Sequence, residues 1–195
     1  MKSWTTRRLT AGLGLLLAAG CSAPAPQPEK KAELTPVERG RYLITVAGCH
    51  DCHSPKTMTE KGPVPDPARL LSGHPQDLAV PKIEPSQVGP GKWFLFNEHL
   101  TAAVGPWGVS FAANLTSDKE TGVGAWPEAL FIQTLRTGKH LGSGRPLLPP
   151  MPWPNLAEAS DEDLKAIFAY LQTVPPVRNQ VPEPIPPTQI AGKQP

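Results

Sequence analysis

The chain has 195 residues, of which 19 are lysine or arginine and 17 are aspartate or glutamate, so its formal net charge is +2. This length suits a single domain. So balanced a charge provides no basic field for nucleic acid, which excludes that class of partner.

Residues 1–20 have the pattern of an export signal that is removed. Three basic residues precede the apolar run Leu9–Ala19, which is too short to span a bilayer as a permanent helix. Small residues before Cys21 are typical of a bacterial lipoprotein cleavage site, where the cysteine becomes the lipidated first residue; an ordinary secretory cleavage nearby is the alternative. Removal leaves 16 basic and 17 acidic residues. We expect an exported protein on the periplasmic side of a bacterial membrane, anchored at Cys21.

Residues 21–33 are rich in proline, alanine and charge, and predict a solvated, disordered tether between the lipid and the folded part. A first helix is expected to begin after Thr35, a capping residue followed by Pro36 at the first helical position. It should run to about Ala47. Gly40 lies inside it, and an interior glycine often permits another element to approach closely.

The run Cys49-His50-Asp51-Cys52-His53 is the most specific pattern in the chain. It matches the Cys-x-x-Cys-His pattern of covalent haem c attachment. One helical turn places both sulfurs along one edge of the macrocycle, and the next residue points its imidazole at the iron. A thioredoxin-like redox pair would need strand–helix alternation, and a zinc site would need a further ligand cluster, which the sequence lacks. The sequence predicts one covalent haem c at Cys49, Cys52 and His53, which leaves no thiol for a disulfide if Cys21 carries lipid.

Residues 54–110 form a long insert in which prolines and glycines recur. Pro67–Leu71 can form a helical turn, and the aromatic stretch Lys92–Phe96 can pair with Thr101–Val104 as a small hairpin. The insert either covers one haem edge and excludes water or is a surface insertion without a role in the chemistry. Both interpretations fit the sequence.

A further helix is expected from about Pro127 to Gly138, and Met151 follows in a loop flanked by prolines. A haem held by His53 has one open axial position. Methionine fills this position in many electron-carrying cytochromes, and flanking prolines stiffen the loop that carries it. We expect His53 and Met151 as the two iron ligands; the alternative is that Met151 only fills the core.

The last helix is expected to begin after Ser160, with Leu164, Ile167, Phe168 and Leu171 at helical spacing. Residues 178–195 then form a proline-rich C-terminal tail, which is extended along the surface or disordered.

These features together resemble the class I c-type cytochromes, and most closely the bacterial periplasmic or lipoprotein cytochrome c domains. The resemblance covers residues 34–177 apart from the insert, and rests on the capped helix before Cys-x-x-Cys-His, the Pro-Met-Pro loop and the final helix. It implies an all-α fold in which a few helices (about three to five) surround one haem. It also implies that the first and last helices cross, with Gly40 against Tyr170 or Phe168.

A haem iron ligated on both faces has no position for a substrate, so this ligand set implies an electron carrier rather than an enzyme. Its partners would be redox proteins such as a dehydrogenase, an oxidase or a respiratory complex, with the membrane reached through the N-terminal lipid. The alternatives are a haem-bearing subunit of a dehydrogenase complex, and a sensor whose iron binds a small molecule or another histidine. A scaffold lipoprotein without haem is a third class. Other residues expected near the haem are Lys56 at its edge, Trp107, Phe111, Trp126 and Trp153 around it, and His74, His99 and His140 as alternative ligands.

Overall fold

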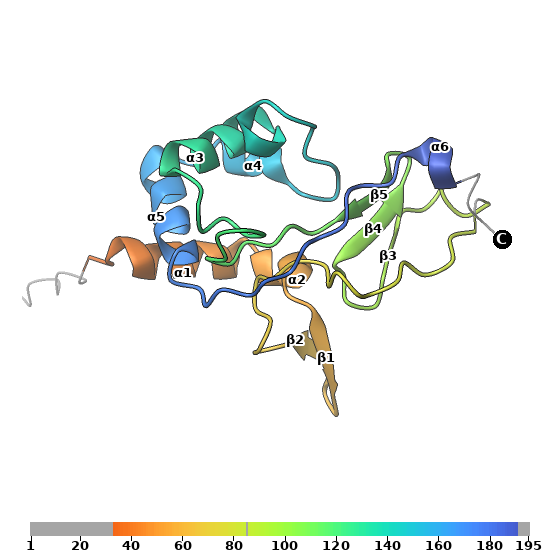
Figure 1. Ribbon diagram of the computed structural model, residues 1–195, viewed down its shortest axis with the longest axis horizontal. Coiled ribbons are helices and arrows are strands. Elements are labelled where there is room, and N and C mark those ends of the chain that lie inside the picture. The colour runs from red at the N-terminus through yellow and green to blue at the C-terminus, as the bar shows by residue number, and fades with distance from the viewer. Residues whose placement is uncertain (1–32, 85, 191–195) are drawn as a thin grey trace, which may run out of the picture. The chain divides into compact units, whose positions relative to one another are not determined.

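The structure, a computed structural model, describes residues 33–84 and 86–190. The expected export signal, Cys21 and all but the last residue of the expected tether lie outside the described residues. Within the described part, no helix is both long enough and apolar enough to cross a bilayer. The elements, shown in Figure 1, are α1 (Pro36–Val46), α2 (Cys49–His53), β1 (Lys56–Thr59), β2 (Gly62–Pro65), β3 (Leu95–Phe96), β4 (Ala102–Gly105), β5 (Gly108–Phe111), α3 (Glu128–Thr137), the 3-10 turn η1 (His140–Gly142), α4 (Trp153–Ala157), α5 (Asp161–Leu171) and α6 (Pro187–Ile190).

The first helix begins where the sequence predicts. The Thr35 hydroxyl accepts a hydrogen bond from the Glu38 amide, and the Glu38 carboxylate accepts one from the Thr35 amide at 2.9 Å, which completes a capping box. The helix ends at Val46. Gly48 then turns the chain into α2 with a φ of 66°, a conformation that side chains rarely adopt.

The first and last long helices, α1 and α5, cross (Figure 1). Gly40 of α1 lies against Ala166 and Tyr170 of α5. A Cβ atom at this glycine would lie 1.9 Å from the Ala166 carbonyl oxygen and 2.8 Å from the Tyr170 Cβ. The close approach therefore requires glycine, as expected, and Tyr170 is the aromatic that lies against it. An ion pair between Arg39 and Asp163, 2.5 Å apart, links the same two helices at the surface.

The helical part encloses one apolar core. Ile44 of α1 and Leu164 and Leu171 of α5 are fully buried, and the rings of Phe131 and Phe168 are 5.3 Å apart. Burial of this apolar area is the main force that holds the short helices together, because isolated helices of this length are marginal in water. The core cluster consists of Ile44, Leu71, Val123, Phe131, Leu135, Leu164, Ile167, Phe168, Leu171 and Val174.

The all-α prediction is wrong, because two small antiparallel sheets accompany the helices, so an all-helical class I cytochrome fold is not supported. Strands β1 and β2 form a hairpin that the sequence did not predict. The second sheet has the order β3-β4-β5, and its pairing of Leu95 with Val104 confirms the hairpin predicted within the insert. Pro67–Leu71 forms turns rather than a helix. The insert is too rich in proline for helix, so its extended segments satisfy their backbone groups by pairing.

The segment after α5 is extended and runs from the helices to the second sheet (Figure 1). Ile185 pairs with Val109 of β5 through two backbone hydrogen bonds of 2.8 and 3.0 Å. On the way, the buried Asn179 amide donates to the carbonyl oxygens of Ser72 and His74 at 2.7 and 2.8 Å. These bonds hold the C-terminal segment on the folded part.

Candidate haem-binding site

The two cysteines of α2 are free thiols, each partly buried. They lie three residues apart, so one helical turn places both side chains on the same side of the helix. Burial raises the pKa of Cys49 to about 11 and also raises the pKa of Cys52. Both thiols therefore stay protonated at neutral pH, unlike the thiolate of a Cys-x-x-Cys redox pair, whose reactivity depends on a lowered pKa.

His53 is 8% exposed, and its Nδ1 lies 2.8 Å from the carbonyl oxygen of Ala113. Because a carbonyl oxygen only accepts, Nδ1 carries the proton and Nε2 keeps its lone pair. Burial lowers the pKa of His53, so the imidazole is neutral. A neutral imidazole with one nitrogen fixed by a backbone carbonyl is the usual arrangement of a histidine that ligates a metal through its other nitrogen.

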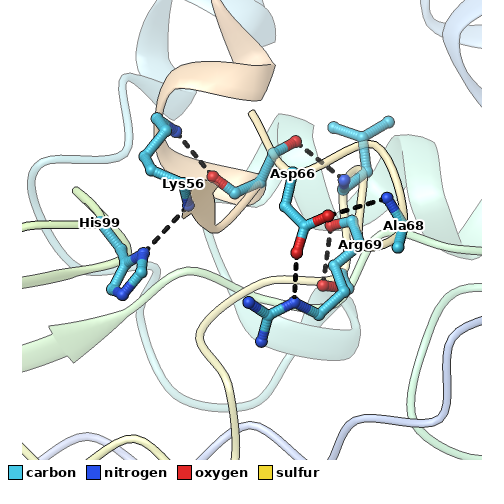
Figure 2. A network of polar contacts seen from close by, with 8 residues as sticks. Lys56, Asp66, Ala68, Arg69 and His99 are labelled. Atoms are coloured by element: carbon cyan, nitrogen blue, oxygen red, sulfur yellow. Dashed lines mark hydrogen bonds and ion pairs between the residues drawn. The ribbon is translucent and has the colours of Figure 1, made fainter. Parts of the chain in front are cut away.

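Lys56 binds the C-terminal end of α2, which carries Cys49, Cys52 and His53 and is called the attachment helix from here on. Its buried ammonium group donates to the carbonyl oxygens of His50, Asp51 and Ser54 at 3.1, 2.8 and 2.6 Å. Its backbone amide donates to Nδ1 of His99 at 3.0 Å, as Figure 2 shows. A cation at the C-terminal end of a helix stabilises the unpaired carbonyl groups there. This lysine, expected at the haem edge, therefore holds the end of α2.

The turn at residues 66–69, which follows the β1–β2 hairpin, is also held next to α2. The Asp66 carboxylate accepts hydrogen bonds from the Ala68 amide and from Arg69 Nε, both at 2.9 Å (Figure 2). The Asp66 amide donates to the carbonyl oxygen of Pro55 at 2.8 Å. The chain on both sides of the β1–β2 hairpin is thereby fixed next to α2.

Met151 is partly buried and packs against the core cluster, as Cys49 does. The methionine loop, defined here as residues 147–152, is tied to the end of α3 at its first residue and has a long hydrogen bond within itself. Its Leu147 amide donates to the carbonyl oxygen of Gly138, and the Met151 amide donates to that of Leu148 at 3.3 Å. The attachment helix and the methionine loop therefore share one apolar core.

The aromatic residues expected around a haem come from two regions. Trp107 and Phe111 belong to the second sheet and its turn, and Trp107 Nε1 donates to the Ser110 hydroxyl at 3.2 Å. Trp126 packs against the core cluster next to α3, and Trp153 begins α4.

Two of the alternative histidine ligands are already engaged. Both ring nitrogens of the fully buried His74 are hydrogen-bonded, to the Thr101 hydroxyl at 2.9 Å and the Leu78 carbonyl oxygen at 3.2 Å. The Nδ1 of His99 accepts from Lys56, whereas His140 meets the Trp126 ring edge-on at 5.9 Å. Across residues 33–84 and 86–190, no three His, Cys, Asp or Glu side chains gather as a metal-binding group.

No protein-family model matches the chain, but several known proteins that contain or are cytochromes are similar to it. One subunit of the nicotinate dehydrogenase of Pseudomonas putida is 38% identical over 77 residues, or 40% of this chain and 6% of that protein. The gluconate 2-dehydrogenase cytochrome c subunit of Pantoea cypripedii is 29% identical over 156 residues, or 80% of this chain and 27% of that one. A dihaem cytochrome c-type protein of Cereibacter sphaeroides is 28% identical over 178 residues, or 87% of this chain and 49% of that one.

The chain spans at most about half the length of these relatives. Cytochrome subunits of quinone alcohol dehydrogenase and fructose dehydrogenase from Gluconobacter species are also similar to it. The similarity supports a c-type cytochrome, and such relatives imply haem c as the cofactor.

Proposed function

We propose that this chain transfers electrons through one haem c, bound covalently at Cys49 and Cys52 and ligated by His53 and Met151. The observation that carries the proposal is the hydrogen bond between His53 Nδ1 and the Ala113 carbonyl oxygen. This bond leaves the Nε2 atom of the buried, neutral His53 free of a proton, and His53 directly follows a pair of cysteines that lie one helical turn apart. These are the groups that covalent haem attachment needs, in the order in which it needs them.

The surroundings of the pair also fit a haem. Cys49 and Met151 pack against one apolar cluster, so a haem between them would meet side chains that exclude water. Bound haem would supply a one-electron iron couple. His53 and Met151 would hold the iron from both faces, and the apolar neighbours would favour its less charged ferrous form. Because both axial positions would be taken by side chains, we propose an electron carrier that does not itself catalyse a reaction.

A dehydrogenase is the electron donor that we propose. Several relatives of this chain are named as cytochrome subunits of dehydrogenases, and they resemble it over most of its length. We further propose that residues 1–20 direct export, that Cys21 carries the lipid anchor on the periplasmic side, and that residues 21–33 tether the domain at 34–177.

The optical spectrum of the oxidised protein tests this function. We expect a low-spin ferric spectrum with the far-red charge-transfer band of methionine–iron ligation, and a redox titration that follows one single-electron step. A high-spin ferric spectrum would mean an open axial position, and would favour a sensor or a ligand-binding haem protein instead.

A further inference from the structure

The end of strand β5 contacts both segments that carry the proposed iron ligands. Ala113, just beyond the strand, accepts the hydrogen bond from His53. Ser110, within the strand, has its hydroxyl oxygen 2.5 Å from the carbonyl oxygen of Pro149, which lies two residues before Met151. One short piece of chain thus joins the attachment helix to the methionine loop.

We propose that Ser110 is a positioning residue that holds the methionine loop at the iron through its hydrogen bond to Pro149. This inference rests on the proposed function, because it takes Met151 as an iron ligand. A hydroxyl donates a single proton, and the Pro149 oxygen at 2.5 Å is a far better acceptor than the Ala103 oxygen at 3.4 Å. The N–H of Trp107 donates to the same hydroxyl at 3.2 Å, which directs its proton towards the loop.

The methionine loop depends on such a bond because it has few donors of its own. Three of the four residues 149–152 are prolines, which have no backbone N–H. The Met151 amide is the remaining backbone donor there, and its bond to Leu148 is long at 3.3 Å. A loop that cannot fix itself through its backbone must be fixed by groups outside it.

Strand β5 is a firm support for this purpose. Ser110 is 8% exposed and pairs with Ala103 of β4 in the sheet. On its other edge β5 is bonded to Ile185, so both edges of the strand are paired. Part of the insert thereby has a defined role, because its last sheet braces the segment that carries the sixth iron ligand.

The test measures how easily an added ligand displaces the methionine from the ferric holoprotein. Imidazole is titrated against wild type and Ser110→Ala, and the loss of the far-red band gives the dissociation constant. We expect Ser110→Ala to bind imidazole roughly fivefold more tightly, as the loss of one hydrogen bond to the methionine-bound state would give. Ser110→Thr keeps the hydroxyl and should restore the wild-type constant.

Ser117→Ala is the matched control, because the Ser117 hydroxyl makes a similar bond of 2.6 Å to the carbonyl oxygen of Val174, which does not belong to the methionine loop. It should leave the imidazole constant unchanged. A wild-type constant in Ser110→Ala, or an equal change in Ser117→Ala, would overturn the inference. If Ser110→Ala does not fold, Trp107→Phe is the second variant, because it removes the hydrogen bond that the Ser110 hydroxyl accepts. It should also make imidazole bind more tightly, and an unchanged imidazole constant would count against the inference. A far-red band that persists in Met151→Ala would instead refute the ligand assignment of the proposed function.

Discussion

Replacement of Met151 by alanine should abolish the far-red methionine–iron band of the oxidised protein and lower its reduction potential. A thioether is a soft ligand that favours ferrous over ferric iron, and the alanine side chain cannot coordinate. We expect the potential to fall by on the order of 0.1 V, since axial ligands set haem potentials over a range of about 0.8 V. The measurements are an optical spectrum and a redox titration of the purified holoprotein.

Met58→Ala is the control for this experiment. Met58 lies on the β1–β2 hairpin, close to His53 in sequence, but 77% of it is exposed to solvent. Its removal should change neither the band nor the potential. Loss of the band in Met58→Ala together with its retention in Met151→Ala would show that the ligand had been assigned to the wrong methionine.

Replacement of Gly40 by alanine should destabilise the fold strongly, although alanine is the better helix former. The added Cβ would lie 1.9 Å from the backbone oxygen of Ala166, so α1 and α5 would have to separate. Overpacking of this kind costs roughly 1–3 kcal/mol or more, against a gain in helix propensity of about 1 kcal/mol. Because the overlap is with a backbone atom, we expect the upper end of this balance, a net loss of about 2 kcal/mol, or a fall in melting temperature of roughly 4–8 °C.

The comparison variant is Arg41→Ala, at the next and exposed position of the same helix. Its melting temperature should stay within about 2 °C of wild type, because exposed substitutions away from special contacts change stability little. If Gly40→Ala proved as stable as Arg41→Ala, or more stable than wild type, the close crossing of α1 and α5 would be incorrect.

The sequence predicted the parts of the fold that local chemistry decides. The Thr35 cap of α1 and the Ser160 cap of α5 involve residues three positions apart, and both form as expected. The close helix crossing at Gly40 was predicted through the family resemblance, and the structure confirms it. The same resemblance predicted an all-α fold, which is wrong because the resemblance did not cover the insert, where the two sheets form.

Apart from the β3–β4 pairing, the structure of the insert could not be predicted, because it depends on pairing between segments that are distant in sequence or locally unfavourable for a strand. Strand β2 contains Pro63 and Pro65, which locally disfavour a strand and are tolerated in a two-stranded hairpin. The bond from His53 to Ala113 spans 60 residues and ends on a backbone carbonyl group, which every residue has. No side-chain pattern could therefore reveal it.

The roles of the side chains that support the site could not be predicted either, because their partners are backbone oxygens of other segments. The sequence predicted Lys56 at the haem edge, yet its ammonium group donates to three backbone oxygens at the end of α2. Ser110 is an ordinary strand residue until the fold brings Pro149 next to it. The assignments of Cys49, Cys52, His53 and Met151 to a haem remain predictions from their residue types and spacing, as does the lipid at Cys21.

The most direct measurement is the mass and colour of the denatured polypeptide after expression in a host that matures c-type cytochromes. We predict a red chain whose mass exceeds that of the processed polypeptide by one haem, and a colourless chain when Cys49 and Cys52 are both replaced by alanine. A wild-type polypeptide that loses all haem on denaturation would contradict covalent attachment at this pair.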